Sequence, residues 1–254
     1  MKVIGIVPAR MAASRFPGKP LHSICGRPMV EHVFCRAAIF PKWDGLYLAT
    51  CDSEIFDYGQ SKGWPTLMTS NQHSRALDRV AEAADICGQP LEEDDVVVCV
   101  QGDEPMLHPD MISESIRPLQ EDAKVPCTVL AMAIVSEEQY RNPDTVKIIH
   151  DIRGDVLYTS RSPVPYCKQF TPELGARRIY GIFAFRWYFL KIFTGMTQSP
   201  LELAESCDSN RILDNGYRQR IAPYAYTPSF SIDRPSDADM VEKQILLDPL
   251  WGKY

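Results

Sequence analysis

The stretch VIGIVPARMAASRFPGKPL, residues 3–21, decides the fold of this 254-residue chain. Its first part, Val3 to Val7, is a short apolar run that predicts a buried β-strand. A loop with three cations, a Pro-Gly turn and no acidic residue follows at once. A strand that ends in such a loop is typical of the phosphate-binding edge of an α/β protein. Arginine offers forked hydrogen bonds and lysine a compact charge, which together suit a polyphosphate.

Two well-known phosphate motifs do not match this loop. Pro20 follows Lys19, where the phosphate loop of nucleoside triphosphatases has serine or threonine. The glycine spacing of the dinucleotide fingerprint is missing as well. Charge alone therefore leaves two alternatives open, a phosphate loop of another family or a set of solvated surface cations.

Composition indicates an ordinary globular protein. The chain is 45% hydrophobic and 24% charged, which is enough for one large α/β domain. Its formal net charge of −6 argues against non-specific binding of nucleic acid. We expect neither a secretory leader nor a membrane span. The eight cysteines form no Cys-x-x-Cys pair, so we expect no zinc site and reduced thiols in a cytoplasmic protein.

Strand-like and helical segments alternate through the first half of the chain, where residues 96–100 form a fully apolar strand. This alternation predicts an α/β fold with a doubly wound, mostly parallel, Rossmann-like sheet. The pattern changes in the second half, whose strand-like runs are residues 127–135, 145–150, 156–158 and 178–186. We therefore expect one domain over residues 1–254, with an inserted mixed β region over roughly 125–200 that covers the substrate and supports a dimer.

A second constellation follows the apolar strand at residues 96–100. The strand runs directly into Gln101-Gly102-Asp103, which places Asp103 at the carboxyl end of the sheet. Open α/β sheets bind their ligands at that edge. A carboxylate near a basic phosphate loop indicates Mg²⁺ that bridges protein and phosphate. A turn-forming Gly-Asp pair without a ligand explains these residues equally well.

Asp233 is a third acidic residue of interest. It ends a short apolar strand, and a helix is expected to begin near Ser236. The residues alone favour a helix cap over a second metal carboxylate.

Taken in order, these segments resemble the 3-deoxy-manno-octulosonate (Kdo) cytidylyltransferase family, also called the CMP-Kdo synthetases. Residues 8–21 are similar to that family's Pro-Ala-Arg…Ser-x-Arg-x-Pro-Gly-Lys-Pro-Leu signature, and residues 100–105, VQGDEP, to its second block. Weaker matches extend the resemblance over nearly the whole chain, at residues 142–147, 160–165, 199–202 and 232–235.

The resemblance implies a nucleotidyltransferase that couples CMP from CTP to an acceptor hydroxyl and releases pyrophosphate. It implies as catalytic residues Arg10, Lys19 and Asp103. The implied ligands of Mg²⁺ are Asp103 and Asp233. The implied nucleotide-binding residues are Pro8, Ala9, Arg10, Arg15, Lys19, His73, Arg79 and Gln101. The implied acceptor-binding residues are Gln101, Arg161, Tyr180, Asp208 and Ser209. The implied partners are CTP and a small anionic acceptor, with no nucleic acid and no membrane, in a homodimer.

The chain also departs from the family pattern. The usual His-x-Ser-Gly-Thr-Glu-Arg run is replaced by HSRALDR at residues 73–79, next to the nucleotide. The His-x-Gly-x-Tyr pattern becomes IYGIF at residues 179–183, and a Glu-Gln pair becomes Asp208-Ser209. A site that loses buried hydrogen-bonding groups discriminates against a polyhydroxy sugar, at a cost on the order of 1–3 kcal/mol per group.

These departures favour a cytidylyltransferase for another anionic acceptor, such as a variant sugar acid, a phosphonate or a phosphorylated small molecule. An ordinary CMP-Kdo synthetase of lipopolysaccharide biosynthesis is the alternative. A non-catalytic nucleotide-binding relative is a third reading. The joint presence of Asp103, Asp233, Arg10 and Lys19 argues against it, because a protein without catalysis has no need for both acids.

Overall fold

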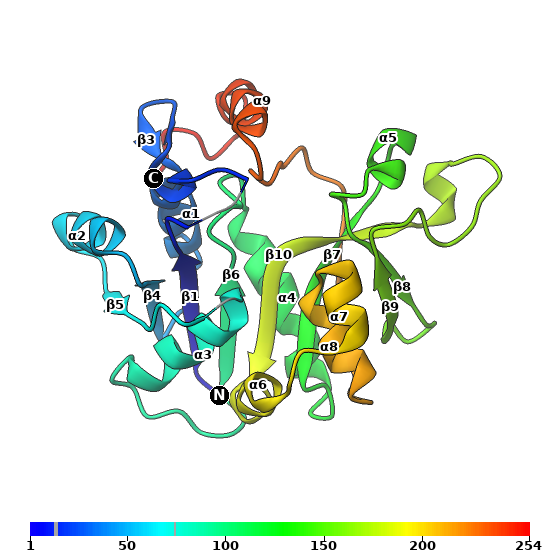
Figure 1. The fold of residues 1–254 in the computed structure, drawn as a ribbon, viewed down its shortest axis with the longest axis horizontal. Coiled ribbons are helices and arrows are strands. Elements are labelled where there is room, and N and C mark those ends of the chain that lie inside the picture. The colour runs from blue at the N-terminus through cyan, green and yellow to red at the C-terminus, as the bar shows by residue number, and fades with distance from the viewer. Residues whose placement is uncertain (13–14, 74) are drawn as a thin grey trace. The chain divides into compact units, whose positions relative to one another are not determined.

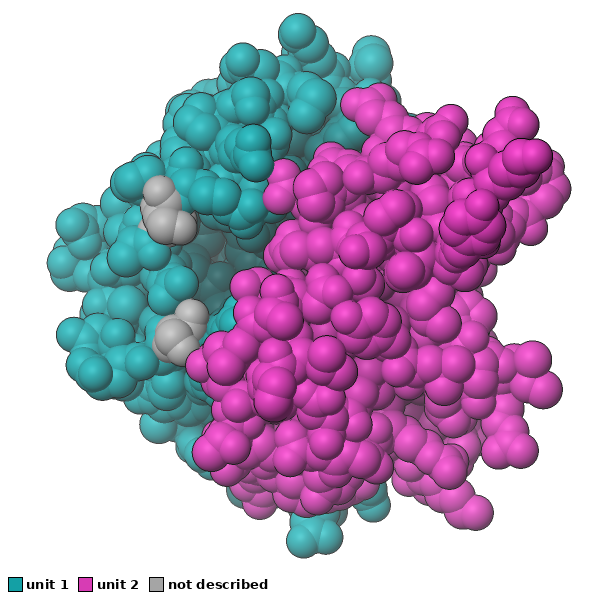
Figure 2. Space-filling model, turned by 45° about the vertical axis from the view of Figure 1, so that its right-hand side comes forward, with its two compact units in different colours: residues 1–113, 228–254 teal, residues 114–227 magenta. Residues whose placement is uncertain are grey.

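The computed structural model describes residues 1–12, 15–73 and 75–254 (Figure 1). Ala13 and Ser14 of the predicted phosphate loop, and Ser74 of the 73–79 run, lie outside the described residues. The fold is mixed α/β with a mostly parallel central sheet and additional antiparallel strands, which confirms the predicted fold class. The chain divides into two compact units, Met1–Ser113 with Pro228–Tyr254, and Glu114–Thr227 (Figure 2).

Four parallel strands form the centre of the first unit. In spatial order they are β6 (Val96–Val100), β1 (Val3–Ala9), β4 (Gly45–Thr50) and β5 (Thr66–Met68). Every residue of β1 and β6 is buried, as expected for strands covered on both faces. Parallel neighbours need crossover connections. These are supplied by α1 (Met29–Ala38), α2 (Ser53–Ser61) and α3 (Ala76–Ile86).

Smaller elements complete this unit around the loop that follows β1. They are η1 (Lys19–Leu21), β2 (Ser23–Ile24), β3 (Arg27–Pro28) and α9 (Pro235–Ile245). The predicted helix near Ser236 is therefore confirmed. One buried cluster joins Phe16 of the loop to Met106, which follows β6, and to Ile232 and Val241 from the end of the chain. This packing anchors three segments that are distant in sequence beside one another.

The second unit holds the mixed strands. Its elements are α4 (Pro109–Glu121, which begins in the first unit), β7 (Cys127–Ala133), α5 (Glu137–Arg141), β8 (Lys147–His150), β9 (Val156–Ser160), η2 (Pro172–Leu174), β10 (Arg177–Arg186), α6 (Trp187–Gly195), α7 (Pro200–Glu205), α8 (Asp208–Asp214) and β11 (Arg220–Tyr224). β7 pairs antiparallel with β10 and parallel with β11. β8 pairs antiparallel with β9 and with the start of β10.

The predicted insertion over roughly 125–200 falls inside the second unit, which continues to residue 227 and includes β11. Whether the chain behaves as one domain stays a prediction. All eight cysteines lie in the described residues and are free thiols. Within the described part of the chain, no helix is both long and apolar enough to cross a membrane.

Candidate active site

The carboxyl ends of the parallel strands in the first unit define the candidate site. β1 ends at Ala9 and β6 ends at Val100, so the segments that follow them leave the same edge of the sheet. Gly102 allows these segments to approach closely. A Cβ atom added there would lie 2.5 Å from the carbonyl oxygen of Pro8, closer than real side chains tolerate. Glycine is therefore required at this position.

Backbone geometry and a neighbouring carboxylate hold the basic loop after β1 in shape. Gly18 has a φ of 74°, in the left-handed region, and precedes Lys19 at the start of η1. Its N–H donates to the carbonyl of Met11 at 3.1 Å, which closes the loop. Asp52, which follows β4, accepts the N–H of Met11 at 2.8 Å. Sequence reasoning missed Asp52, although its position just after a strand was an available signal.

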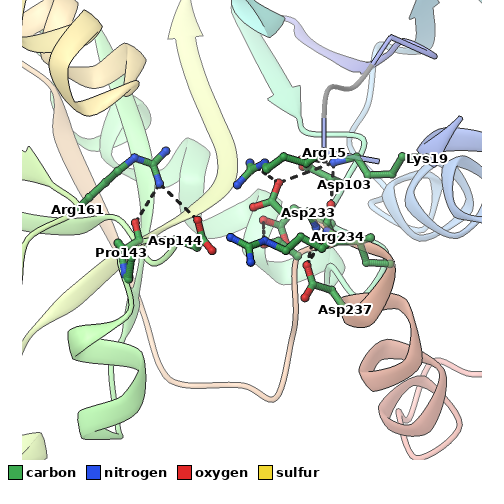
Figure 3. A network of polar contacts seen from close by, with 12 residues as sticks. Arg15, Lys19, Asp103, Pro143, Asp144, Arg161, Asp233, Arg234 and Asp237 are labelled. Carbon is green, nitrogen blue, oxygen red and sulfur yellow. Dashed lines mark hydrogen bonds and ion pairs between the residues drawn. The ribbon is translucent and has the colours of Figure 1, made fainter. Parts of the chain in front are cut away.

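Four charged side chains from distant segments meet in this unit (Figure 3). The ammonium of Lys19 lies 3.0 Å from Asp103 Oδ2 and 4.0 Å from Asp233 Oδ1. It also donates to the carbonyl of Ile232 at 2.7 Å. Arg15 Nη2 pairs with Asp233 Oδ1 at 2.8 Å. The structure thus brings together two predicted metal ligands, Asp103 and Asp233, and two predicted nucleotide-binding cations, Arg15 and Lys19.

A backbone hydrogen bond explains why Asp103 and Asp233 are neighbours. The N–H of Ile232 donates to the carbonyl of Asp103 at 3.0 Å. The helix cap expected for Asp233 is wrong, because Arg234 occupies the N-cap position of α9. The N–H groups of Asp233 and Arg234 both donate to Asp237 Oδ2 at 2.8 Å. Asp237 therefore accepts the two N–H groups at the helix start, and the carboxylate of Asp233 pairs with Arg15.

The pair of carboxylates fits a Mg²⁺ site. A single ammonium, that of Lys19, is within 4.0 Å of both acids, so one cation can interact with the two together. Mg²⁺ is usually held by one or two carboxylates, with water and substrate phosphates completing its six ligands. No group of three or more potential ligands from His, Cys, Asp and Glu is found among the described residues. Substrate oxygens and water would therefore have to supply the remaining ligands.

Arg10 and His73 lie at the same sheet edge. Arg10 is exposed, and its Nη1 donates to the carbonyl of His73 at 3.4 Å. The ring of His73 pairs with Glu82, which also accepts the N–H of Ser70. Partial burial alone would raise the pKa of Glu82, but the hydrogen bonds from Ser70 and His73 hold it below its ordinary value.

Arg79 has a different position from the other predicted nucleotide contacts. Its side chain is buried, and it donates to the hydroxyl of Thr69, to the carbonyl of Ser70 and to the thiol of Cys51. These partners come from the ends of β4 and β5. The guanidinium therefore holds Thr69 and Ser70, which directly follow β5, close to Cys51 at the end of β4.

In the second unit, Arg161 directly follows β9 and is 32% exposed. Its Nε donates to the carbonyl of Glu205 at 2.8 Å. Its Nη1 donates to the carbonyl of Pro143 at 2.9 Å, as Figure 3 shows. Nη1 also lies 4.0 Å from Asp144 Oδ1. The guanidinium is thus held on two sides by backbone carbonyls.

Glu205, at the end of α7, supports this arrangement and was missed by sequence reasoning. Its carboxylate accepts the Tyr158 hydroxyl at 2.8 Å, the Ser160 hydroxyl at 2.7 Å and the N–H of Arg161 at 2.8 Å. Partial burial would raise the pKa of Glu205, but these donors lower it below its ordinary value. Glu205 therefore stays ionised at neutral pH and fixes the end of β9.

The other predicted acceptor residues occupy several environments. Tyr180 is fully buried in β10, with the guanidinium carbon of Arg178 5.4 Å from its ring centre. Asp208 begins α8 and is half-buried, and Ser209 is buried. Gln101 is half-buried in the first unit. Their roles in binding an acceptor stay predictions.

Comparisons with known proteins identify the family of this chain. The cytidylyltransferase family model matches residues 4–221. A 3-deoxy-manno-octulosonate cytidylyltransferase from Oleidesulfovibrio alaskensis is 43% identical over 241 residues, which are 95% of this chain and 95% of that protein. One from Syntrophus aciditrophicus is 37% identical and covers 97% of this chain and 98% of its own length.

The chain also resembles two solved structures, one of them from the same family of enzymes. A CMP:2-keto-3-deoxy-manno-octonic acid synthetase complexed with CTP matches with a TM-score of 0.87 and 32% identity, over 97% of this chain and 99% of that chain. A 4-diphosphocytidyl-2C-methyl-D-erythritol synthase from Anaerococcus prevotii, at 15% identity and a TM-score of 0.62, shows the fold alone. This chain therefore belongs to the cytidylyltransferase family, as a CTP-dependent nucleotidyltransferase related over nearly its whole length to the 3-deoxy-manno-octulosonate cytidylyltransferases.

Proposed function

We propose that this protein transfers CMP from CTP to 3-deoxy-manno-octulosonate and releases pyrophosphate, as a step of lipopolysaccharide biosynthesis. One observation carries the proposal. Relatives that are 36–43% identical and cover 93–97% of this chain are named for this acceptor. The matches extend through the second unit, which contains Arg161.

This proposal replaces the variant acceptor that the sequence departures favoured. The relatives support the ordinary Kdo acceptor better than another anion. In the 179–183 run, Phe183 is buried in β10, so the change there falls on a packed position, whereas Ile179 is half-buried. Arg161, the predicted contact to the acceptor carboxylate, is retained and partly exposed.

In the proposed reaction, the acceptor hydroxyl attacks the α-phosphorus of CTP. A new P–O bond forms there while the bond to the leaving pyrophosphate breaks, and the hydroxyl proton passes to solvent water. Catalysis of such a transfer depends on positioning and charge neutralisation more than on covalent chemistry. Arg10, Arg15 and Lys19 supply cations for the triphosphate. Mg²⁺ bound by Asp103 and Asp233 would neutralise phosphate charge and polarise the acceptor hydroxyl.

The charge cluster gives this scheme a specific consequence. In the structure, Lys19 and Arg15 pair with the same two carboxylates that the proposal assigns to Mg²⁺. Binding of the triphosphate would therefore change the partners of both the cations and the carboxylates. The cations would move to phosphate oxygens, and Asp103 and Asp233 would then be the residues that hold Mg²⁺.

Pyrophosphate release by the purified protein tests the proposed function. With Mg²⁺, we expect release that requires both CTP and Kdo, and we expect no release when UTP replaces CTP. Acceptor panels with an amino-substituted octulosonate, a phosphonate and a phosphorylated small molecule serve as comparisons. Release with one of these acceptors and none with Kdo would contradict the proposal.

A further inference from the structure

Lys147 is a charged side chain that the proposed reaction does not use. It is the first residue of β8, and its side chain is fully buried. Its Nζ donates to the backbone carbonyls of Asn142 at 2.8 Å, Thr145 at 2.5 Å and Arg161 at 2.6 Å. An ammonium has three N–H donors, so each of them has an acceptor.

The three carbonyls that accept from Lys147 belong to two short segments of the second unit. One is the carbonyl of Arg161 itself, and the other two lie in residues 142–145. That second segment also contains Pro143, whose carbonyl accepts from Arg161 Nη1 at 2.9 Å. One buried ammonium therefore ties the backbone of Arg161 to the backbone on which its side chain rests.

We propose that Lys147 is a positioning residue for acceptor binding, whose ammonium fixes the Arg161 guanidinium in the orientation that receives the acceptor carboxylate. This inference rests on the proposed function, in which Arg161 binds that carboxylate. A guanidinium recognises a carboxylate through a planar fork of donors. A small displacement of the fork costs much of that interaction, so the residue that fixes it influences acceptor affinity.

The surroundings of Lys147 give it an unusual titration. In the sheet it lies opposite Arg178 of β10 and Ser160 of β9. Burial, and next the charge of Arg161, lower the pKa of Lys147 to about 8, while Glu205 opposes the shift. A neutral amine has two hydrogens. Above this pH one of the three carbonyls therefore loses its donor, and the tie between the two segments weakens.

The weaker acceptor binding that follows from this change can be distinguished experimentally from unfolding of the protein. Because the pKa of Lys147 falls from 10.5 to about 8 on folding, the unfolded chain binds more protons at this group between those two values. The contribution of Lys147 to the free energy of unfolding therefore increases with pH in this window. Acceptor binding is expected to weaken as the pH rises through about 8, so the two effects have opposite signs.

Substitutions of Lys147 test the inference. Lys147→Met removes the donors, and Lys147→Arg keeps a positive charge. The matched control is Lys124→Met, at an exposed lysine of the same unit. We expect Lys147→Met to raise KM for Kdo on the order of 10- to 100-fold, with KM for CTP changed by less than about twofold. Lys147→Arg should fall between that variant and the wild type, and Lys124→Met should match the wild type.

The pH profile of the wild type provides a test that needs no variant. KM for Kdo should rise between about pH 7 and about pH 9, while KM for CTP does not follow it. In Lys147→Arg this rise should disappear, because a guanidinium stays protonated throughout. If Lys147→Met fails to fold, the pH profiles of KM for Kdo in the wild type and in Lys147→Arg still test the inference.

The inference is overturned if KM for Kdo is the same in Lys147→Met and wild type, or if both substrates lose affinity equally. It is also overturned if the wild-type profile is flat. Failure of the proposed function has a different signature, since wild type would then show no turnover of Kdo at all. The same KM comparison would in that case be made with the anionic acceptor that does turn over, and it would still decide the role of Lys147.

Discussion

At the scale of single residues, the candidate site consists of two cations paired with two carboxylates. Lys19 and Arg15 neutralise Asp103 and Asp233, which lie far apart in the sequence. The basic loop and Asp103 could be identified from the sequence, because a loop at a strand end has a recognisable pattern. Asp52 and Glu205 were missed, although Asp52 stands just after a strand. Their functions arise from contacts with Met11 and Arg161, which no local pattern encodes.

The partner exchange at Lys19 predicts opposite effects on two ligands. In Lys19→Met the triphosphate loses a cation, so the dissociation constant of CTP should rise on the order of 10-fold. The carboxylates of Asp103 and Asp233 lose a competitor, so Mn²⁺, used as a probe for Mg²⁺, should bind the nucleotide-free protein more tightly. Isothermal titration measures both affinities. Lys62→Met, at an exposed lysine paired with Glu31, is the control. Weaker binding of both ligands by Lys19→Met would contradict the exchange.

At the scale of elements, the site depends on how strand ends are connected. The apolar runs at 3–7 and 96–100 predicted β1 and β6, and the alternation of strands and helices predicted the parallel sheet between them. The order of the strands did not follow from the pattern, because pairing is decided by packing between distant segments. Asp233 was misread as a cap for the same reason, since Asp237 performs that function.

The contact between the two strand ends makes Gly102 a structural requirement. A methyl group there would meet the carbonyl oxygen of Pro8 at 2.5 Å, and a backbone oxygen cannot move aside cheaply. We expect Gly102→Ala to lower the free energy of unfolding by about 1–3 kcal/mol and to weaken CTP binding, because it separates Asp103 from the basic loop. Urea denaturation measures the change. Gly195→Ala, where an added Cβ meets nothing within 4 Å, should not be destabilised. Equal stability of Gly102→Ala and wild type would refute the argument.

At the scale of the whole molecule, the predicted roles divide between two compact units. The triphosphate and metal residues belong to the first, and Arg161 with its supporting network belongs to the second. The sequence predicted the change of pattern after residue 125 but not the inclusion of β11 in the second unit. The sequence of a short strand does not indicate which other strands it will pair with.

The proposed homodimer makes a prediction at this scale. The second unit exposes Ile152 at 104% and Leu157 at 61%, which are large apolar side chains that a partner could cover. We expect sedimentation to give a mass twice the 28.7 kDa of one chain. The double variant Ile152→Asp and Leu157→Asp should sediment as a monomer. A monomeric wild type, or a double variant that stays dimeric, would count against this surface.

The transfer of CMP to Kdo is the central claim, and a competition measured by phosphorus NMR tests it most directly. The wild-type protein is given CTP, Mg²⁺ and equal concentrations of Kdo and an amino-substituted octulosonate. The account predicts that pyrophosphate appears together with the phosphodiester signal of CMP-Kdo as the main product. A main product that carries the amino-substituted sugar, with Kdo left unchanged, would contradict it.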